Sequence, residues 1–154
     1  MKKQSKHAFN LPFAGIDEFM GFPILFGDKG DYSIILGITN PVIQYDADET
    51  KYSVYHHALS SVVKLLGEGH IIQKQDVFIR RKYRPVPSEV FLEQKYQEHF
   101  SGREFTEIRS YITFTKQVKK GTFYTFDEKM LHKFIRDLGK VIEVLNAAGL
   151  HPRV

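Results

Sequence analysis

The side chains in this sequence that could carry out chemistry are histidines, serines and carboxylates, and their spacing assembles no catalytic or metal site. His56 and His57 are adjacent, so on a helix they point about 100° apart and cannot grip one metal ion. Ser60 follows His56 by four residues, but no strained turn or oxyanion donor accompanies this pair. We therefore expect a polar helix face here, with no catalytic residue, metal ligand or cofactor site in the chain.

Two glycine-rich segments could be mistaken for phosphate-binding loops. Gly27-Asp28-Lys29-Gly30 lacks the GxxxxGK[ST] spacing of a P-loop and precedes an expected strand instead of a helix. Gly67-Glu68-Gly69-His70 follows an expected helix. We predict a hairpin turn for the first segment and a helix C-terminus for the second.

One basic segment has the composition of a binding surface. Its candidate binding residues are Arg80, Arg81, Lys82, Tyr83 and Arg84, with Lys74 earlier on the same strand. The cations could neutralise phosphates, and the tyrosine ring could stack on a base. The favoured alternative is a solvated strand end whose charges discourage aggregation. A contact with anionic lipid or an acidic protein stays open.

The composition is that of an ordinary globular domain. The 154 residues are 42% hydrophobic and 26% charged, with a net charge of +4 and no cysteine. Disulfides and thiolate chemistry are therefore excluded. No apolar run reaches the roughly 18 residues that would cross a bilayer, which predicts a cytoplasmic location. We expect a flexible lead-in over residues 1–12 and a single domain over 13–150.

Hydrophobic periodicity predicts an α+β fold with element order β-β-α-β-α-β-α. We expect strands over 21–26, 32–40, 71–83 and 106–118, a helix from Asp46 or Asp48 to Leu66, a short helix between Ser88 and Gly102, and a helix from the segment Thr125-Phe126-Asp127-Glu128 to about Ala148. The hairpin at the start favours a mainly antiparallel sheet of about four strands, with helices packed on one face.

Local signals add details to this outline. Pro23 should place its strand at a sheet edge or a strand start. Thr125-Phe126-Asp127-Glu128 has the pattern of a capping box for the last helix. The aromatic residues of the weakly patterned N-terminal stretch suit an interface with a partner or another domain. They are Phe9, Phe13, Phe19 and Phe22.

Several segments together resemble the N-terminal domain of TraG-type conjugative-transposon ATPases of Bacteroidetes. The resemblance covers roughly residues 30–148. It is carried by Tyr52, His56, Leu59 and Lys64-Leu65-Leu66 on a helix, then by a strand with the signature Lys74, Gln75, Asp76 and Phe78. Downstream it continues in Phe91-Leu92, Tyr96, His99 through Arg103, and Tyr111-Ile112-Thr113-Phe114-Thr115.

The resemblance implies a non-catalytic assembly domain of a type IV secretion ATPase. The family's nucleotide-binding motifs lie in a large C-terminal domain, so this chain would be truncated before it and the full-length parent would be the enzyme. The implied location is cytoplasmic and peripheral at the inner membrane. Implied partners are inner-membrane secretion-channel proteins and other subunits of the same ATPase, in a homo-oligomer of the full-length protein. The alternative is a free-standing nucleic-acid-binding module that uses residues 80–84.

Overall fold

The computed structural model describes residues 13–40, 48–118 and 127–154. The expected lead-in over 1–12, Asp46 and the Thr125 end of the capping box lie outside these residues. The elements are β1 (Phe13–Phe19), β2 (Phe22–Gly27), β3 (Tyr32–Ile38), α2 (Glu49–Leu66), β4 (His70–Lys82), α3 (Phe91–Phe100), β5 (Glu104–Lys116) and α4 (Glu128–Ala147). The predicted α+β class and the order of the expected elements are confirmed, with one further strand at the start.

The described strands form one antiparallel five-stranded sheet in the order β1-β2-β3-β5-β4. The sheet has one strand more than the four that we expected, because the sequence of β1 gives no clear strand signal. Most β1 residues are exposed, so the strand has no clear apolar alternation. β1 pairs with the outer side of β2, so β2 is not an edge strand. Pro23 is the second residue of β2 and therefore lies near a strand start.

Two turns and one continuous strand pairing set the register of this sheet. A two-residue turn, Met20-Gly21, joins β1 to β2, and both residues have positive φ. Between β2 and β3 the predicted hairpin turn is confirmed, with the Gly27 amide donating to the Asp31 carbonyl. β4 and β5 pair without interruption from His70↔Lys116 to Lys82↔Glu104.

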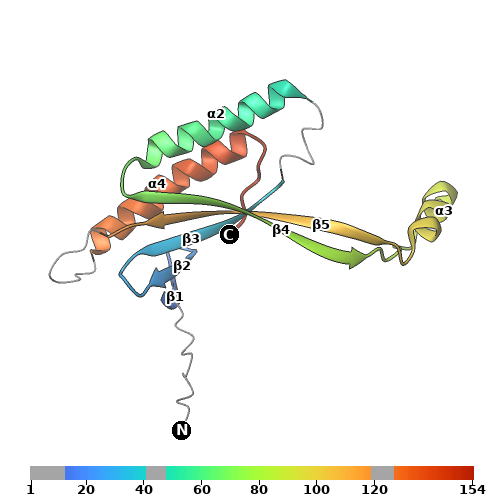
Figure 1. Ribbon diagram of the computed structural model, residues 1–154, viewed down its shortest axis with the longest axis horizontal. Helices are drawn as coiled ribbons and strands as arrows, with labels where there is room; N and C mark the ends of the chain where they lie inside the picture. The colour runs from blue at the N-terminus through green and yellow to red at the C-terminus, as the bar shows by residue number, and fades with distance from the viewer. Residues whose placement is uncertain (1–12, 41–47, 119–126) are drawn as a thin grey trace, which may run out of the picture.

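The core lies between one face of the sheet and the helices α2 and α4. Alternate residues of β3 point into it, while Ile35 on the opposite face is 46% exposed. The broad apolar stripe predicted for α4 is buried against this face, and α2 packs beside α4 (Figure 1). The fully buried side chains include Ile24, Ile34, Leu36, Ile112, Phe114, Val62, Leu131, Phe134, Leu138, Val141, Leu145 and Leu150.

Aspartate side chains cap both of these helices. Asp48 is one of the two caps that the sequence offered for α2. The capping-box prediction for α4 is wrong, because Asp127 is the N-cap and Glu128 stands at the first helical position instead of the third. The Asp48 carboxylate accepts hydrogen bonds from the Thr50 and Lys51 amides. Asp127 does the same for Lys129 and Met130 at the start of α4. The predicted C-terminal role of the Gly67 segment is also confirmed, because Gly67 caps α2 with φ of 66°.

The third described helix, α3, departs from the expectation that the helices pack on one face of the sheet. Beyond the two packed helices, β4 and β5 continue as a two-stranded ribbon, and α3 sits at its far end (Figure 1). None of the residues of α3 is buried. The expected Ser88 cap is also wrong in detail, since the N-cap is Val90, which makes no side-chain cap bond. Among the described helices, none is long and apolar enough to cross a membrane.

Candidate functional site

A projecting arm is the feature of this fold that core packing does not explain. We define the arm as residues 77–82 of β4 and 104–109 of β5, and the tip as residues 83–103, which include α3. Phe78 and Phe105 on the arm are 67% and 45% exposed, because no helix covers the ribbon at this distance from the core (Figure 1). A two-stranded ribbon without a packed face is marginally stable in water, so other interactions must support it.

Charge pairs across the ribbon supply part of that support. Glu107 accepts hydrogen bonds from Arg109 and Arg81, and both contacts hold the pKa of this carboxyl below its usual range. Arg80 lies 3.8 Å from Glu104. Glu107 is half-buried and the other groups are exposed, so each pair contributes little alone. The pairs of Arg81 with Glu107 and of Arg80 with Glu104 join β4 to β5 and favour this register of the ribbon.

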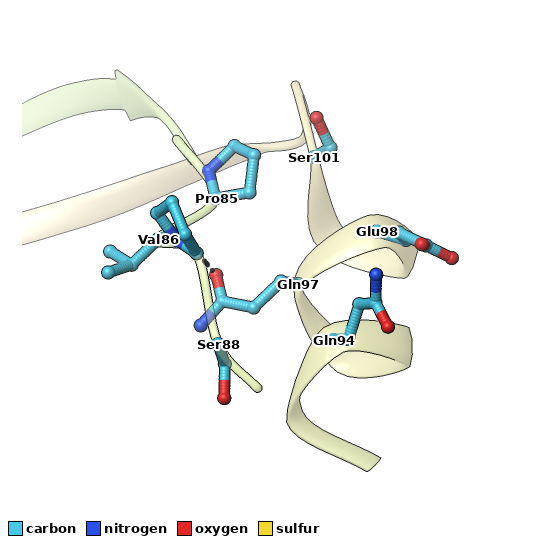
Figure 2. A pocket seen from close by; sticks show the side chains of 8 residues that line it. Pro85, Val86, Ser88, Gln94, Gln97, Glu98 and Ser101 are labelled. Atoms are coloured by element: carbon cyan, nitrogen blue, oxygen red, sulfur yellow. Dashed lines mark hydrogen bonds between the residues drawn. The ribbon is translucent and has the colours of Figure 1, made fainter. Parts of the chain in front are cut away.

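The tip is closed by a set of hydrogen bonds centred on Gln97. The Tyr83 hydroxyl donates to Gln97 Oε1 at 2.7 Å, and the Val86 amide donates to the same oxygen at 2.9 Å. Figure 2 shows the Gln97 side chain directed from α3 toward the Val86 backbone. The Tyr83 ring also packs edge-on against Phe100. These contacts fix α3 on the end of the arm.

A pocket of about 540 Å³ lies between α3 and the segment that carries Pro85 and Pro87 (Figure 2). Its lining consists of proline rings, amides and hydroxyls, with Glu98 as the one charged side chain of the lining. Glu98 itself pairs with Lys95 at 2.7 Å. The hydroxyl of Ser88 donates to the Glu93 carboxylate at 2.5 Å, and the amides and hydroxyls of the lining suit hydrogen bonding to a peptide.

Large apolar side chains cover the tip beside this pocket. Phe91, Leu92 and Tyr96 on α3 are 67%, 77% and 56% exposed. Val86 and Val90 next to them are also exposed. Scattered apolar residues are normal on a surface, but five within eleven positions of one protruding tip form a patch typical of protein interaction sites.

The predicted basic patch is divided between two faces of the ribbon. Arg80 and Lys82 alternate with Arg81 and Tyr83, so neighbours point to opposite sides. Arg80 and Arg81 have the carboxylate partners described above, whereas Lys82 and Arg84 have no ion pair among the described residues. The Tyr83 hydroxyl is hydrogen-bonded to Gln97 within the tip. The five residues therefore lie close in sequence without forming one basic surface.

The resemblance signature lies where the ribbon leaves the core. The carboxylate of Asp76 accepts from Lys74 and, at 2.5 Å, from the buried hydroxyl of Ser110 on β5. These two hydrogen bonds hold the pKa of Asp76 below its ordinary value. Gln75 points to the opposite face of β4, and Phe78 lies on the exposed arm. Lys74 thus belongs to a structural cluster, and sequence spacing alone gave no sign of the Ser110 contact.

The contacts of Ser61 and His70 are ordinary structural ones. The Ser61 hydroxyl donates to the His57 carbonyl on the same helix, and His70 stacks on Phe134. Within residues 13–40, 48–118 and 127–154, no group of three or more histidine or carboxylate side chains could hold a metal ion. Of the aromatic N-terminal residues that fall in this part, Phe19 and Phe22 pack against the core and Phe13 is partly exposed.

No model of a protein family matches this chain, and no curated protein matches it in sequence. The functional argument therefore depends on the geometry of the arm and its tip.

Proposed function

We propose that this chain is a non-catalytic docking domain that binds protein partners through the tip of its arm. The observation that carries the proposal is that α3 exposes Phe91, Leu92 and Tyr96 and buries none of its residues. A ten-residue helix is marginal in water, and its apolar side chains gain nothing from exposure. A partner that covers the tip would account for both features.

The shape of the arm favours docking over catalysis. The ribbon carries α3 away from the body, so the apolar side chains can enter a recess on another molecule (Figure 1). Interfaces concentrate their binding energy in a few buried aromatic and large apolar side chains, surrounded by polar groups. Phe91, Leu92 and Tyr96, flanked by glutamates and glutamines, match that composition.

The biological setting that we propose is conjugative DNA transfer. The resemblance to TraG-type ATPases supports a role as the assembly domain of a type IV secretion ATPase, with the nucleotide-binding motifs in a C-terminal domain of a longer parent. In this setting the tip docks on secretion-channel proteins or neighbouring subunits, and the parent lies at the cytoplasmic side of the inner membrane as a peripheral protein.

The test of this proposal is the Leu92→Asp substitution in the parent gene of a donor cell. Leu92 is 77% exposed, so the folded chain tolerates the change, whereas a buried charge at an interface weakens docking at least ~30-fold. We expect transfer frequency to fall by a similar factor while the protein level on an immunoblot stays constant.

The matched control is Val54→Asp on α2, where a 50% exposed apolar side chain receives the same charge away from the tip. Transfer by this variant should equal that of the wild type. Unchanged transfer by Leu92→Asp would refute docking through the tip. An equal loss in both variants would show that the defect is not specific to the arm.

A further inference from the structure

The outer edge of β4 has the form of a second binding surface. β4 is the last strand in the order of the sheet, so it pairs with β5 on one side and with no described strand on the other. An edge strand presents amide and carbonyl groups to which another strand can bind. The opposite edge, β1, has a register shift between Phe13 and Gly15 and carries Asp17 and Glu18, features that hinder such pairing. β4 is thirteen residues long and pairs with β5 without a bulge, so it offers the longer and more regular edge.

The backbone groups that face this edge belong to the even-numbered residues of β4. The Gln117 amide donates to the Gly69 carbonyl, and the Tyr83 amide donates to the Arg103 carbonyl. Gly69 and Tyr83 thus both direct backbone groups to β5. Because these groups point alternately to the two sides of an antiparallel strand, the odd residues between them face β5 and the even residues from 70 to 82 face the free edge. A further strand must pair with the even-numbered residues.

The side chains near the middle of this edge do not guard it against pairing. A lysine on an edge strand usually discourages the approach of another strand. Lys74, however, is paired with the Asp76 carboxylate, so residues 70–79 carry no formal net charge. Ile71 and Phe78 on either side of this pair are 45% and 67% exposed. The edge therefore combines backbone groups available for pairing with exposed apolar side chains.

The order of the charges fits a second copy of the same strand. Two β4 strands that pair antiparallel about a two-fold axis at Gln75 place Lys74 of each copy opposite Asp76 of the other. Both residues are even-numbered, so their backbone groups can form the hydrogen bonds of this register. Moving the axis by one residue would set Lys74 against Lys74 or Asp76 against Asp76, and like charges directly opposite each other are destabilising. Of these three registers, only the one with its axis at Gln75 opposes unlike charges.

The same register pairs the exposed apolar side chains. Ile72 lies opposite Phe78 of the second copy, and Ile71 lies opposite Ile79. Ile72 is partly buried against the core, so Phe78 of the second copy would extend that core. The arm of each copy then lies along the body of the other, which supports a ribbon that is marginally stable by itself.

We infer that two copies of this chain pair through the free edges of their β4 strands, with the two-fold axis at Gln75. The two five-stranded sheets then join into one continuous sheet of ten strands. The same surface of each copy forms the contact, so the association closes at the dimer. This inference uses the edge of β4 and does not depend on docking through the tip.

Sedimentation velocity of the purified chain over increasing concentration tests for the dimer. We expect a monomer–dimer equilibrium with the dimer populated below about 1 mM, the weak end of specific association. A chain that stays monomeric up to that concentration would overturn the inference. Leu92→Asp alters the tip and not β4, so this variant should dimerise as the wild type does. Loss of its dimer would assign self-association to the tip and overturn the pairing of β4.

A single cysteine reports the register, because the chain has no cysteine of its own. The Gln75 side chain is exposed, and the two Gln75 residues of the dimer would form a non-hydrogen-bonded pair with Cα atoms about 4.5 Å apart. This distance suits a disulfide, so Gln75→Cys should give a covalent dimer under mild oxidation.

Gln73→Cys is the matched control, since Gln73 is exposed on the same face of β4. In the proposed register the two Gln73 residues are offset by four residues, or about 13 Å, beyond the roughly 7 Å that a disulfide spans. On a non-reducing gel, Gln75→Cys should form the covalent dimer at least ~10-fold faster than Gln73→Cys. Equal rates would overturn the inference.

Phe78→Lys tests the apolar contact between the copies. The side chain is 67% exposed, so the single chain should fold as before, whereas a lysine beside Ile72 of the second copy should weaken the dimer at least ~10-fold. Phe105→Lys makes the same change on β5, at a 45% exposed position outside the β4 edge, and should dimerise like the wild type. Unaltered dimerisation of Phe78→Lys, or an equal loss in both variants, would contradict pairing through β4.

Discussion

Asp76 shows how a single carboxylate can stabilise the point where the arm leaves the body. Its side chain is 31% exposed and accepts hydrogen bonds from Lys74 on its own strand and from the buried Ser110 on β5. An ionised acceptor strengthens both bonds, and a buried hydroxyl without a partner would be costly. The ionised carboxylate of Asp76 therefore stabilises the pairing of β4 with β5.

We expect Asp76→Asn to destabilise the fold by about 1 kcal/mol at neutral pH, since charge-assisted hydrogen bonds are lost but the site is partly solvated. The pKa of Asp76 in the folded chain lies below its ordinary value of 3.8. The ionised form therefore stabilises the fold above that value, and this contribution is lost as pH falls through the folded-state pKa.

Urea unfolding at neutral pH and at pH about 2.5 would measure the effect. The difference between wild type and Asp76→Asn should shrink at the lower pH. Ser110→Ala, which removes one of the two donors and leaves the charge, should retain part of the pH dependence. A difference between wild type and Asp76→Asn that is equal at both pH values would contradict the role of ionisation.

At the scale of elements, α3 and α4 differ both in the strength of their apolar stripes and in their surroundings. Both carry apolar residues at helical spacing, but α4 buries its stripe in the core and α3 buries no residue. The stability of α3 must come from the Gln97 contacts and from the strands that carry it. Local opening should therefore cost less free energy at the tip than in the body.

We predict that amides of α3 exchange with solvent by local opening, whereas the amides of β3 and α4 exchange only on global unfolding. Tyr83→Phe should accelerate exchange in α3 about fivefold, because a lost hydrogen bond is worth about 1 kcal/mol. Global stability should not change. Hydrogen exchange followed by mass spectrometry would measure both quantities.

Tyr96→Phe is the matched control, since the Tyr96 hydroxyl makes no hydrogen bond within the described part of the chain. Its exchange rates should equal those of the wild type. Protection of α3 as strong as that of α4 would show that the tip is stabilised by more than the contacts described above.

At the scale of the whole molecule, the net charge of +4 permits weak binding to nucleic acid anywhere on the surface. A dedicated site would need cations on one face. Arg80 and Lys82 lie on one side of the ribbon, and Arg81 lies on the other with a carboxylate partner. The nucleic-acid-binding alternative stays a prediction, and measurement of duplex DNA affinity can distinguish it from the docking function.

We expect duplex DNA affinity to be equally reduced by Lys82→Glu on the arm combined with Arg84→Glu on the tip (the arm variant) and by Lys29→Glu with Lys64→Glu on the body. Each reversal lowers the net charge by two, so both double variants go from +4 to neutral. Fluorescence anisotropy at low salt would measure the affinities. A selective loss in the arm variant would favour a nucleic-acid site at residues 80–84 over the docking function.

Local patterns in the sequence were sufficient to predict most elements of the fold. Period-two alternation predicted β5, the stripe from Leu131 to Leu145 predicted α4, and Asp48 was one of the two aspartates predicted to cap α2. These signals can be recognised in the sequence because each depends on residues that lie close together along the chain. β1 was missed because its exposed residues have no such periodicity.

Only the tertiary structure decided which helix packs its apolar side chains against the core and which leaves them exposed. The sequence determined that residues 88–101 favour a helix, but its distance from the core follows from the length of the β4–β5 pairing. Asp76 and Ser110 meet across 34 residues, and Phe19 meets His132 of α4 across more than a hundred. Burial and pairing at such separations depend on the whole chain, so local periodicity could not show the arm or its exposed tip.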